Sequence, residues 1–534
     1  MPEPAPSLGF ERLGALSVAD RELGVVVDVS HAGLEPRELE ALGPALARAL
    51  AAMAELEAGA IKNADEGRMV GHYWLRAPTL APSPELTRAI VEAEAQVHAV
   101  ASAVAAGALR PEKSGRFRHA VVVGIGGSAL GPQLVVDALS AGARGAGALA
   151  LHFADTPDPD GSDRLRAALG EELDATLTVV ISKSGGTKET RNGMLELAQA
   201  YRARGLAFGA HAIAITQAES ELDRFAVSEG FLARLPMWDW VGGRTSVTSA
   251  VGLLPAALAG VDVGGFLRGA ATMDVLTRRT EPSANPACLL AAALHHAGHG
   301  TGERALVVLP YKDRLALFSR YLQQLVMESL GKREDRQGRV VTQGLTVYGN
   351  KGSTDQHAYV QQLRDGRDDV LACFVEVLVD RAGASLEVEP GTTSGDYLTL
   401  FLHGTRRALD ACGRPSVLLS LERLDAASVG ALVALFERTV GLYAELVDVN
   451  AYHQPGVEAG KRAAAELIAL QGAVISVLPS ERGLAATARE LAATLGVSDL
   501  EGVLAIVRHL AANGRAHRAA APDAAWYDER YWRG

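Results

Sequence analysis

Short runs of β-branched and other apolar residues alternate with longer helical stretches through most of the chain after residue 119. Most of these runs lead into a glycine- or serine-containing loop and then into an amphipathic stretch. Strands separated by helical segments of this length predict parallel sheets covered by helices. The predicted strands are residues 120–123, 177–181, 212–215, 304–309, 370–378 and 416–420.

At 534 residues the chain is too long for one ordinary hydrophobic core, and glycines and prolines between residues 260 and 286 indicate a division there. We therefore expect four segments. They are a helical N-terminal segment that packs on the core (residues 1–110), a first α/β domain (111–262), a second α/β domain (263–471) and a helical C-terminal extension (472–534).

The formal net charge of −11 argues against broad binding to nucleic acid phosphates. An anionic substrate then needs local positive charge from a few side chains and backbone amides. The cysteines Cys288, Cys373 and Cys412 fit neither a disulfide framework nor a zinc pattern. No signal peptide or bilayer-spanning run is apparent, because stretches such as Val251–Leu258 are broken by glycine and proline. We expect a soluble, cytoplasmic protein without nucleic acid or membrane partners.

Two loops that follow predicted strands carry the residue types of a phosphate site. Gly124–Ala129 (GIGGSA) lets the backbone approach a ligand, although a tight strand-to-helix turn explains it equally well. It lacks the third glycine of a dinucleotide site. Ser182–Thr190 (SKSGGTKET) brings hydroxyls, glycines and lysines to a helix start, where the helix dipole favours an anion. Simple capping of that helix is the alternative, and the spacing is not that of a P-loop.

Four further segments contain residues that suit proton transfer or charge stabilisation. They hold Arg244 in GGRTS, Glu328 in MESLGK, His357 in DQHA and Lys461 in QPGVEAGK. Burial next to Met327 would raise the pKa of Glu328 towards that of a useful base. Each segment alone also has an ordinary explanation: a solvated turn, an exposed glutamate, a structural histidine or an exposed lysine.

Together and in this order, these motifs resemble the glucose-6-phosphate isomerase family. The resemblance runs from about residue 65 to about residue 465 and is most specific at MESLGK and QPGVEAGK. It implies two sugar-isomerase-type (SIS), doubly wound, mainly parallel α/β domains with helical additions at both ends. It also implies a homodimer with a shared active site, and neither metal nor cofactor. The implied reaction is the reversible isomerisation of glucose 6-phosphate and fructose 6-phosphate, a step of glycolysis and gluconeogenesis.

The resemblance also implies the role of each matched residue. Glu328 matches the base that moves a proton between C2 and C1, and Arg244 matches the group that stabilises the enediolate. His357, which the family supplies from the partner subunit, and Lys461 match the residues that assist ring opening. The other matched positions are substrate contacts, namely Gly127, Ser128, Ser182, Lys183, Ser184, Thr187, Gln324 and Gln454.

These residue types suit that chemistry. Breaking a C–H bond next to a carbonyl group needs a base and leaves negative charge on oxygen, which a guanidinium stabilises. Histidine titrates in the range needed to protonate a ring oxygen. The phosphate takes no part in the bond changes, but its binding energy positions the sugar.

Three features depart from the family pattern. Gly185 and Gly186 replace bulkier or hydroxyl residues, so we expect the phosphate loop to close differently. Asp355 stands where animal-type members have glycine, and we expect it to orient His357 or to raise its pKa. Leu484–Asn513 faintly resembles a helix-turn-helix, but a packing extension is the default expectation on an acidic protein.

Two alternatives remain open. A non-catalytic sugar-phosphate sensor with the same domains would need the Ser182–Thr187 loop, but not Glu328, His357 and Lys461 together. An isomerase that also accepts mannose 6-phosphate is not distinguished by these residues. An amino-sugar-phosphate enzyme would need a source of ammonia such as a glutaminase domain.

Overall fold

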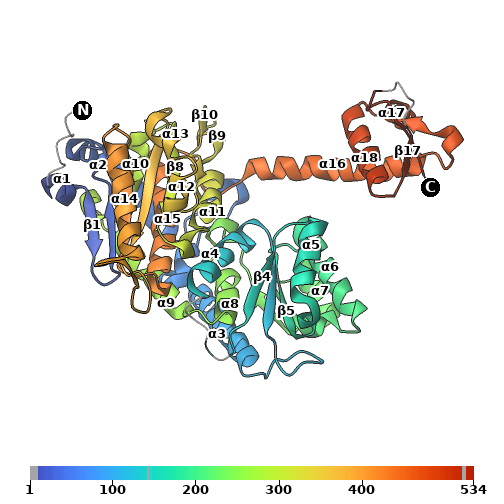
Figure 1. Cartoon of the computed structure of the whole chain (residues 1–534), viewed down its shortest axis with the longest axis horizontal. Helices are drawn as coiled ribbons and strands as arrows, with labels where there is room; N and C mark the ends of the chain where they lie inside the picture. The colour runs from blue at the N-terminus through green and yellow to red at the C-terminus, as the bar shows by residue number, and fades with distance from the viewer. Residues whose placement is uncertain (1–9, 141–144, 146, 520–524, 534) are drawn as a thin grey trace. The chain divides into compact units, whose positions relative to one another are not determined.

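The computed structural model describes residues 10–140, 145, 147–519 and 525–533. The chain forms two compact units, residues 1–453 and 454–534. The larger unit contains two separate parallel sheets with helices against them, as the alternating pattern predicts (Figure 1).

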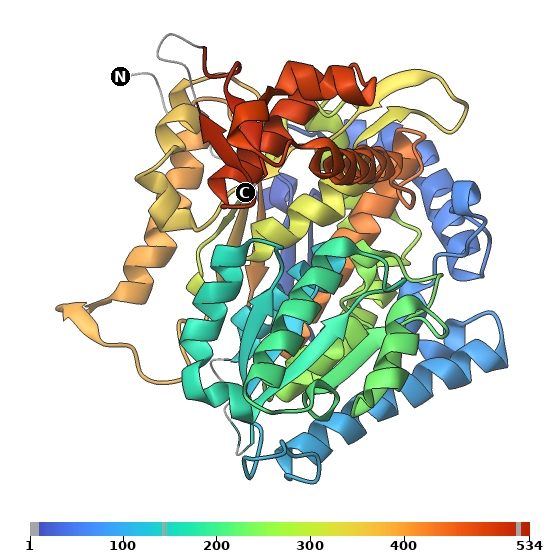
Figure 2. The ribbon, with the colours of Figure 1, turned by 90° about the vertical axis from the view of Figure 1, so that its right-hand side faces the viewer.

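The first sheet holds the strands of the first predicted domain, all parallel, in the order β4-β3-β5-β6-β7. Alternate side chains point to opposite faces, as in any strand. Val121 and Val180 pack in the cluster that includes α6 and α7, whereas Val122 and Val179 belong to the main core. Figure 2 shows this domain towards the viewer. Its elements are β3 (His119–Val123), α4 (Leu130–Leu139), β4 (Ala150–Ala154), α5 (Pro159–Leu169), β5 (Thr176–Ile181), α6 (Lys188–Ala203), β6 (Ala212–Thr216), α7 (Glu221–Glu229) and β7 (Ala233–Pro236).

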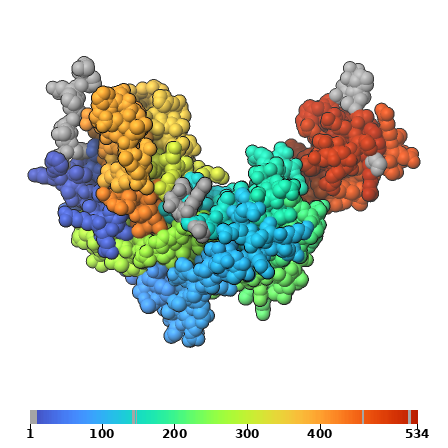
Figure 3. Space-filling view, turned by 60° about the horizontal axis from the view of Figure 1, so that its bottom comes forward, coloured from blue at the N-terminus to red at the C-terminus, as the bar shows by residue number. Residues whose placement is uncertain are grey.

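The second sheet has the order β1-β2-β15-β12-β8-β11. Four strands are parallel: β8 (Ala305–Pro310), β11 (Val347–Tyr348), β12 (Val370–Val377) and β15 (Ser416–Leu421). At one edge, the antiparallel strands β1 (Ser17–Asp20) and β2 (Val25–Asp28) extend the sheet. Figure 3 shows the N-terminal residues, in dark blue, on the same side of the molecule as the orange chain near residue 400.

The prediction that residues 1–110 are helical is partly wrong, because this segment contains β1 and β2. The helices α2 (Pro36–Glu57) and α3 (Pro84–Ala105) form as predicted, but the segment before them adds to the second sheet. The physical reason is the run Val25–Val27, which is β-branched and mostly buried beside β15. The N-terminal segment is therefore part of the second domain's core.

Several long helices fill the core around the sheets. They are α8 (Ala250–Leu258), α9 (Val263–Thr277), α10 (Pro286–Ala297), α14 (Ser394–Asp410) and α15 (Ala426–Leu446). The expectation that no stretch could span a bilayer is wrong by length and composition alone, because α15 is long and apolar enough. However, 89% of its most apolar window is buried inside the protein, so α15 is a core helix.

Shorter elements lie beyond the strand ends of the second sheet. They are α1 (Phe10–Ala15) near the N-terminus, α11 (Phe318–Leu322), the π-helix η11 (Gln323–Glu328), α12 (Gly352–Gln356), α13 (Val360–Asp365), and two hairpins, β9 (Lys332–Glu334) with β10 (Val340–Gln343) and β13 (Glu387–Glu389) with β14 (Thr392–Thr393). The β13–β14 hairpin projects from the larger unit, in light orange at the left of Figure 2.

The C-terminal unit contains more than helices. Helix α16 (Pro455–Val477) runs through the expected boundary at residues 471 and 472, and β16 (Ala486–Thr487), α17 (Ala488–Leu495), α18 (Leu500–Ala512), β17 (His517–Ala519) and β18 (Arg530–Trp532) follow. The small sheet has the order β16-β18-β17, which is the topology of a winged helix. Asp499 and Glu501 at the start of α18 place negative charge where a DNA-reading helix of this kind meets the bases.

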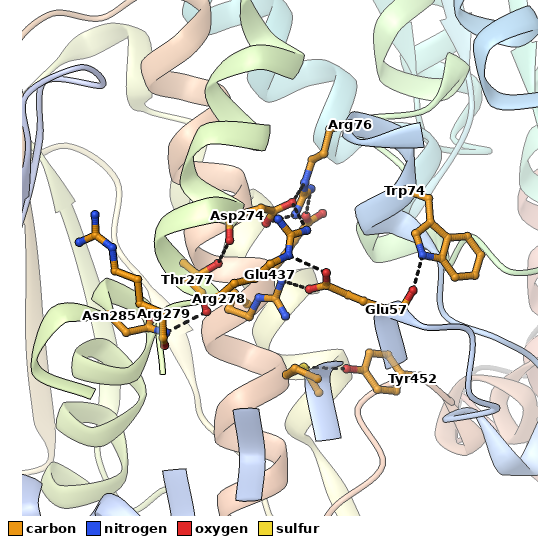
Figure 4. Close-up of polar contacts among 12 residues, drawn as sticks. Glu57, Trp74, Arg76, Asp274, Thr277, Arg278, Arg279, Asn285, Glu437 and Tyr452 are labelled. Carbon is orange, nitrogen blue, oxygen red and sulfur yellow. Dashed lines mark hydrogen bonds and ion pairs between the residues drawn. The ribbon is translucent and has the colours of Figure 1, made fainter. Parts of the chain in front are cut away.

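A buried cluster of charged residues joins three parts of the larger unit (Figure 4). Arg76, from the segment after α2, bonds to Asp274 of α9 with distances of 2.6 and 2.9 Å and to Glu437 of α15. Glu57 at the end of α2 pairs with Arg438 of α15 and, at 2.7 Å, with Arg278 of α9. Burial raises the pKa of Glu437 to about 7, although Arg76 opposes this shift. The cluster ties the N-terminal segment to the core helices.

Replacing Asp274 by Asn should destabilise the protein strongly. The side chains of Asp274 and Arg76 are both 0% exposed, so the substitution leaves a buried guanidinium without its main counter-charge. Breaking such a pair on one side typically costs about 3–5 kcal/mol. Asp163→Asn, in the exposed Asp163–Arg166 pair, should cost less than about 1 kcal/mol. Urea unfolding of both variants measures the difference, and equal midpoints would contradict the assigned role.

Candidate active site

Two glycine loops from different parts of the chain touch each other at the end of the first sheet. A methyl group on Gly127 would overlap the backbone carbonyl of Gly243, so this contact requires glycine. Ser246 Oγ donates to the Gly243 carbonyl at 2.8 Å and lies 3.4 Å from the Gly127 carbonyl. The loop before α4, whose short 3-10 turn ends at Ser128, therefore packs directly on the loop that carries Arg244.

The first glycine loop also faces the π-helix of the second domain. A methyl group on Gly126 would lie 3.0 Å from the side-chain nitrogen of Gln324. Gln324 is thus positioned beside the GIGGSA loop, although the two segments are far apart in sequence. The structure brings together three of the predicted motifs here.

The Ser182–Thr187 loop leads from β5 into α6, as predicted. Ser182 Oγ and Ser184 Oγ each accept a hydrogen bond, at 3.2 Å, from the N–H groups of Gly185 and Gly186 respectively. Gly185 has a φ of +76°, and a methyl group there would overlap the Leu222 nitrogen, which explains the departure from bulkier residues. A cavity of about 170 Å³ adjoins the loop and is lined in part by Ser182, Gly185, Thr190 and Arg191.

The N-terminus of α6 suits an anion. Thr187 is the N-cap residue, but its side chain makes no capping hydrogen bond and so does not occupy the N–H groups of the first turn. Such N–H groups and the helix dipole together favour a phosphate. Simple capping of α6 by Thr187 therefore does not explain this loop.

Lys183 ties the phosphate loop to the arginine loop. Its Nζ donates to the carbonyl groups of Asp239 at 3.0 Å and Val241 at 3.1 Å, just before Gly242. The pKa of Lys183 is lowered to about 8, mainly by burial and to a smaller extent by Arg68. In this structure the ammonium group of Lys183 holds the neighbouring loop, and its place in the phosphate site stays a prediction.

Glu328 and Arg244 face each other although they lie far apart in the sequence. Glu328 Oε2 lies 3.3 Å from Arg244 Nε, and their side chains are 21% and 7% exposed. Glu328 is the last residue of the π-helix Gln323–Glu328, which interrupts the regular winding of the α11 region. Such π-helical turns are rare and occur often at functional sites, because they turn side chains away from the ordinary helical register.

Backbone carbonyl groups hold the guanidinium of Arg244. Its Nη1 donates to the Ala451 carbonyl at 2.7 Å and to Ser329 Oγ at 2.8 Å, and its Nη2 donates to the His453 carbonyl at 3.2 Å. Burial lowers the pKa of Arg244, and Glu328 opposes this shift. The sequence analysis missed Ser329 and residues 451–453 as neighbours, although they lie next to Glu328 and Gln454 in the chain.

His357 lies outside this cluster. It follows α12 and precedes α13, and its side chain is exposed. Asp355 does not contact it: the Asp355 carboxylate accepts hydrogen bonds from the Asn350 N–H at 2.9 Å and from the Tyr359 hydroxyl at 2.6 Å. The expectation that Asp355 orients His357 is thus not supported, because this carboxylate fixes the turn instead.

Gln454 and Lys461 belong to the C-terminal unit. Pro455 begins α16, and Lys461 lies within the same helix. Their roles at the active site remain predictions from the family resemblance. Among the residues that the structure describes, no group of three or more His, Cys, Asp or Glu side chains is arranged to hold a metal ion.

The chain is similar to known proteins over most of its length. A sequence profile of the phosphoglucose isomerase family matches residues 37–387 and 406–475, more than half of the chain. The chain belongs to the phosphoglucose isomerase family. A glucose-6-phosphate isomerase from Geobacter sulfurreducens is 56% identical over 518 residues, which cover 96% of this chain and 97% of the relative. One from Nostoc punctiforme is 55% identical over 494 residues, covering 92% and 93% of the two chains.

A solved structure of the family also matches. The crystal structure of a glucose-6-phosphate isomerase from Chlamydia trachomatis gives a TM-score of 0.78 at 26% identity, covering 89% of this chain and 93% of that one. These matches confirm the predicted family, the parallel α/β fold class and the predicted enzyme, a glucose-6-phosphate isomerase. The alignment with the Geobacter relative also extends beyond residue 475, where the family profile ends, so that relative shares part of the C-terminal unit.

Gly127→Ala should lower isomerase activity on the order of a hundred-fold, because a displacement of about 1 Å at a reacting centre has effects of that size. The added methyl group pushes the GIGGSA loop away from Gly243 and so shifts Arg244. Gly115→Ala is the control, since a methyl group at Gly115 meets no atom within 4 Å. Steady-state kinetics of both variants tests this, and normal activity in Gly127→Ala would show that the contact is dispensable.

Proposed function

We propose that this enzyme interconverts glucose 6-phosphate and fructose 6-phosphate with Glu328 as the base and Arg244 as the group that stabilises the enediolate. The observation that carries this proposal is the 3.3 Å approach of Glu328 Oε2 to Arg244 Nε beside the glycine loops. A carboxylate next to a guanidinium is suited to take a proton from carbon while negative charge develops on a nearby oxygen.

The phosphate binds first, at the Ser182–Thr187 loop and the N-terminus of α6. Its binding positions the sugar so that C2 lies over Glu328. His357 and Lys461 then assist opening of the ring: a proton reaches the ring oxygen, the C1–O5 bond breaks, and the C1 hydroxyl loses its proton to give the aldehyde. The ring-opening residues come from the family resemblance, and the phosphate site is supported by the uncapped end of α6.

Proton transfer then completes the reaction. Glu328 removes the proton from C2, the C2–H electron pair forms the C1=C2 bond, and the C1 carbonyl oxygen takes negative charge next to Arg244. A proton moves from the C2 hydroxyl to the C1 oxygen, and Glu328 returns its proton to C1 to give the ketose. The atoms and charges balance without an external acid, because the carboxylate that takes the proton also gives it back.

We infer that the active enzyme is a homodimer in which His357 completes the partner's site. The side chain of His357 is exposed, and its loop is anchored to α14 because Gln356 Nε2 donates to the Phe401 carbonyl at 3.1 Å. The same region exposes large apolar side chains, which favours a protein–protein contact there. These side chains are Leu386 (72% exposed), Val388 (52%), Leu400 (64%) and Phe401 (47%).

We also infer that the enzyme works in the cytoplasm, without a cofactor. Cys288 and Cys373 are buried free thiols, and burial raises the pKa of each to about 12, which keeps them as unreactive thiols. A cytoplasmic location is in keeping with unpaired cysteines. Mannose 6-phosphate remains a candidate second substrate, since it differs from glucose 6-phosphate only at the carbon that Glu328 would deprotonate.

Glu328→Gln should abolish turnover almost completely while leaving substrate binding largely intact. The amide keeps the size of the side chain but cannot accept the C2 proton. A coupled assay of fructose 6-phosphate conversion, without added divalent metal, measures the loss. Glu334→Gln, at an exposed position in β9, is the control that should retain activity. Retained turnover in Glu328→Gln would show that another residue is the base. Because the protein would still be catalytic, that result would also leave the non-catalytic sensor without support.

A mixed dimer tests the shared site. Glu328→Gln and His357→Ala subunits carrying different affinity tags are co-expressed, and the dimer that contains one of each is purified. If His357 acts in the partner's site, one site carries both substitutions and the other carries none, so the mixed dimer should recover roughly half of the wild-type activity. An inactive mixed dimer would place both residues in the site of one subunit.

A further inference from the structure

Lys332 is a buried lysine for which the reaction above has no role. Lys332 is 4% exposed, and it is the first residue of β9, four positions after Glu328. A lysine is almost never so buried unless its ammonium group has fixed partners. The Lys332 Nζ donates to the backbone carbonyl of Glu328 at 2.8 Å.

This hydrogen bond closes the end of the π-helix. In a continuing α-helix the carbonyl of Glu328 would accept from the N–H of the residue four positions later, which is Lys332. The chain has already left the helix there, because Lys332 pairs with Gln343 in the β9–β10 hairpin. The Lys332 side chain therefore supplies the donor that the backbone no longer supplies.

The ammonium group also lies in the electrostatic field of the reacting pair. The pKa of Lys332 is lowered to about 8, mainly by burial and to a smaller extent by Arg244, while Glu328 opposes the shift. His453 is the other titratable group that interacts with Lys332. Burial lowers the pKa of His453, Lys332 and Arg244 add to this effect, and Asp65, 3.6 Å from its ring, opposes it.

We propose that Lys332 is a positioning residue, which fixes the last turn of the π-helix so that the Glu328 carboxylate is held at its working distance from Arg244. Its single anchoring bond to the Glu328 backbone leaves the carboxylate unhindered for the substrate. The inference rests on the proposed role of Glu328 as base.

The test compares Lys332→Met, Lys332→Arg and the wild type. Methionine keeps most of the side chain's apolar length but removes the donor and the charge, whereas arginine retains both. Lys113→Met is the matched control, because the exposed Lys113 also caps a helix end, donating to the Arg204 carbonyl after α6 at 2.6 Å. For each protein, kcat and KM are measured from about pH 6 to about pH 10, which spans the lysine titration.

We expect Lys332→Met to lose on the order of a hundred-fold in kcat, with KM changed by less than about threefold, because the base is displaced while phosphate binding is unaffected. The sign of the pH effect follows from the lowered pKa: the wild type loses the charge on Lys332 as the pH rises through about 8, so its kcat should fall there. Lys332→Met should lack this fall, and Lys332→Arg should move it to higher pH. Lys183 also has a pKa of about 8, but it is present in every variant and so cancels in the comparison.

The outcomes separate this inference from the proposed function. If the wild type is active and Glu328→Gln is not, but Lys332→Met keeps its kcat and the wild-type pH profile, Lys332 has no positioning role. If Glu328→Gln is also active, the proposed base itself is wrong. Should Lys332→Met fail to fold, as judged by circular dichroism, the pH profile of Lys332→Arg decides. An alkaline fall in kcat with the same size and midpoint as in the wild type would overturn the inference.

Discussion

The buried contact between Arg244 and Glu328 is the interaction on which the active site depends. A guanidinium that is removed from water needs hydrogen-bond acceptors and a counter-charge. Here the Ser329 hydroxyl and the carbonyl groups of residues 451–453 accept its hydrogen bonds, and the Glu328 carboxylate is the counter-charge. Those acceptors come from the π-helix and from the segment before α16. Each of these segments must therefore keep its place for the charge of Arg244 to remain compensated.

This requirement explains how the two sheets cooperate. The glycine loop of the first sheet meets the arginine loop at Gly127, and the base is carried by a helix that follows β8 of the second sheet. The two sheet domains are held against each other by α8, α9 and α15, while the cluster of Arg76, Asp274 and Glu437 locks the N-terminal segment onto those helices. Rigid support by buried helices suits an active site in which small displacements of the reacting groups lower the reaction rate.

Much of this arrangement could be predicted from the sequence. The strand–loop–helix order after residue 119 correctly predicted the parallel strands. The motif at Ser182–Thr187 was placed correctly between β5 and α6 because its residue types and its position agree. The two N-terminal strands were missed, since a three-valine run beside helical patterning gives a weak local signal and its partner, β15, lies far along the chain. The π-helical turn at Glu328 and the anchoring of Lys332 have no sequence signature, because both arise from where the chain leaves one element and enters another.

The bonds of Lys183 have a consequence for substrate size. Its ammonium group holds the carbonyl groups of Asp239 and Val241, which lead directly into the loop of Arg244. If a phosphate binds at the Ser182–Thr187 loop, as proposed above, it would compete for that ammonium group, and the change would reach Arg244 through the few peptide units after Val241. A free hexose has no phosphate to compete for the ammonium group, so the hydrogen bonds from Lys183 to Asp239 and Val241 would stay as they are. Such a sugar would be turned over slowly even at saturating concentration, because it leaves unused the distant binding energy that prepares the site.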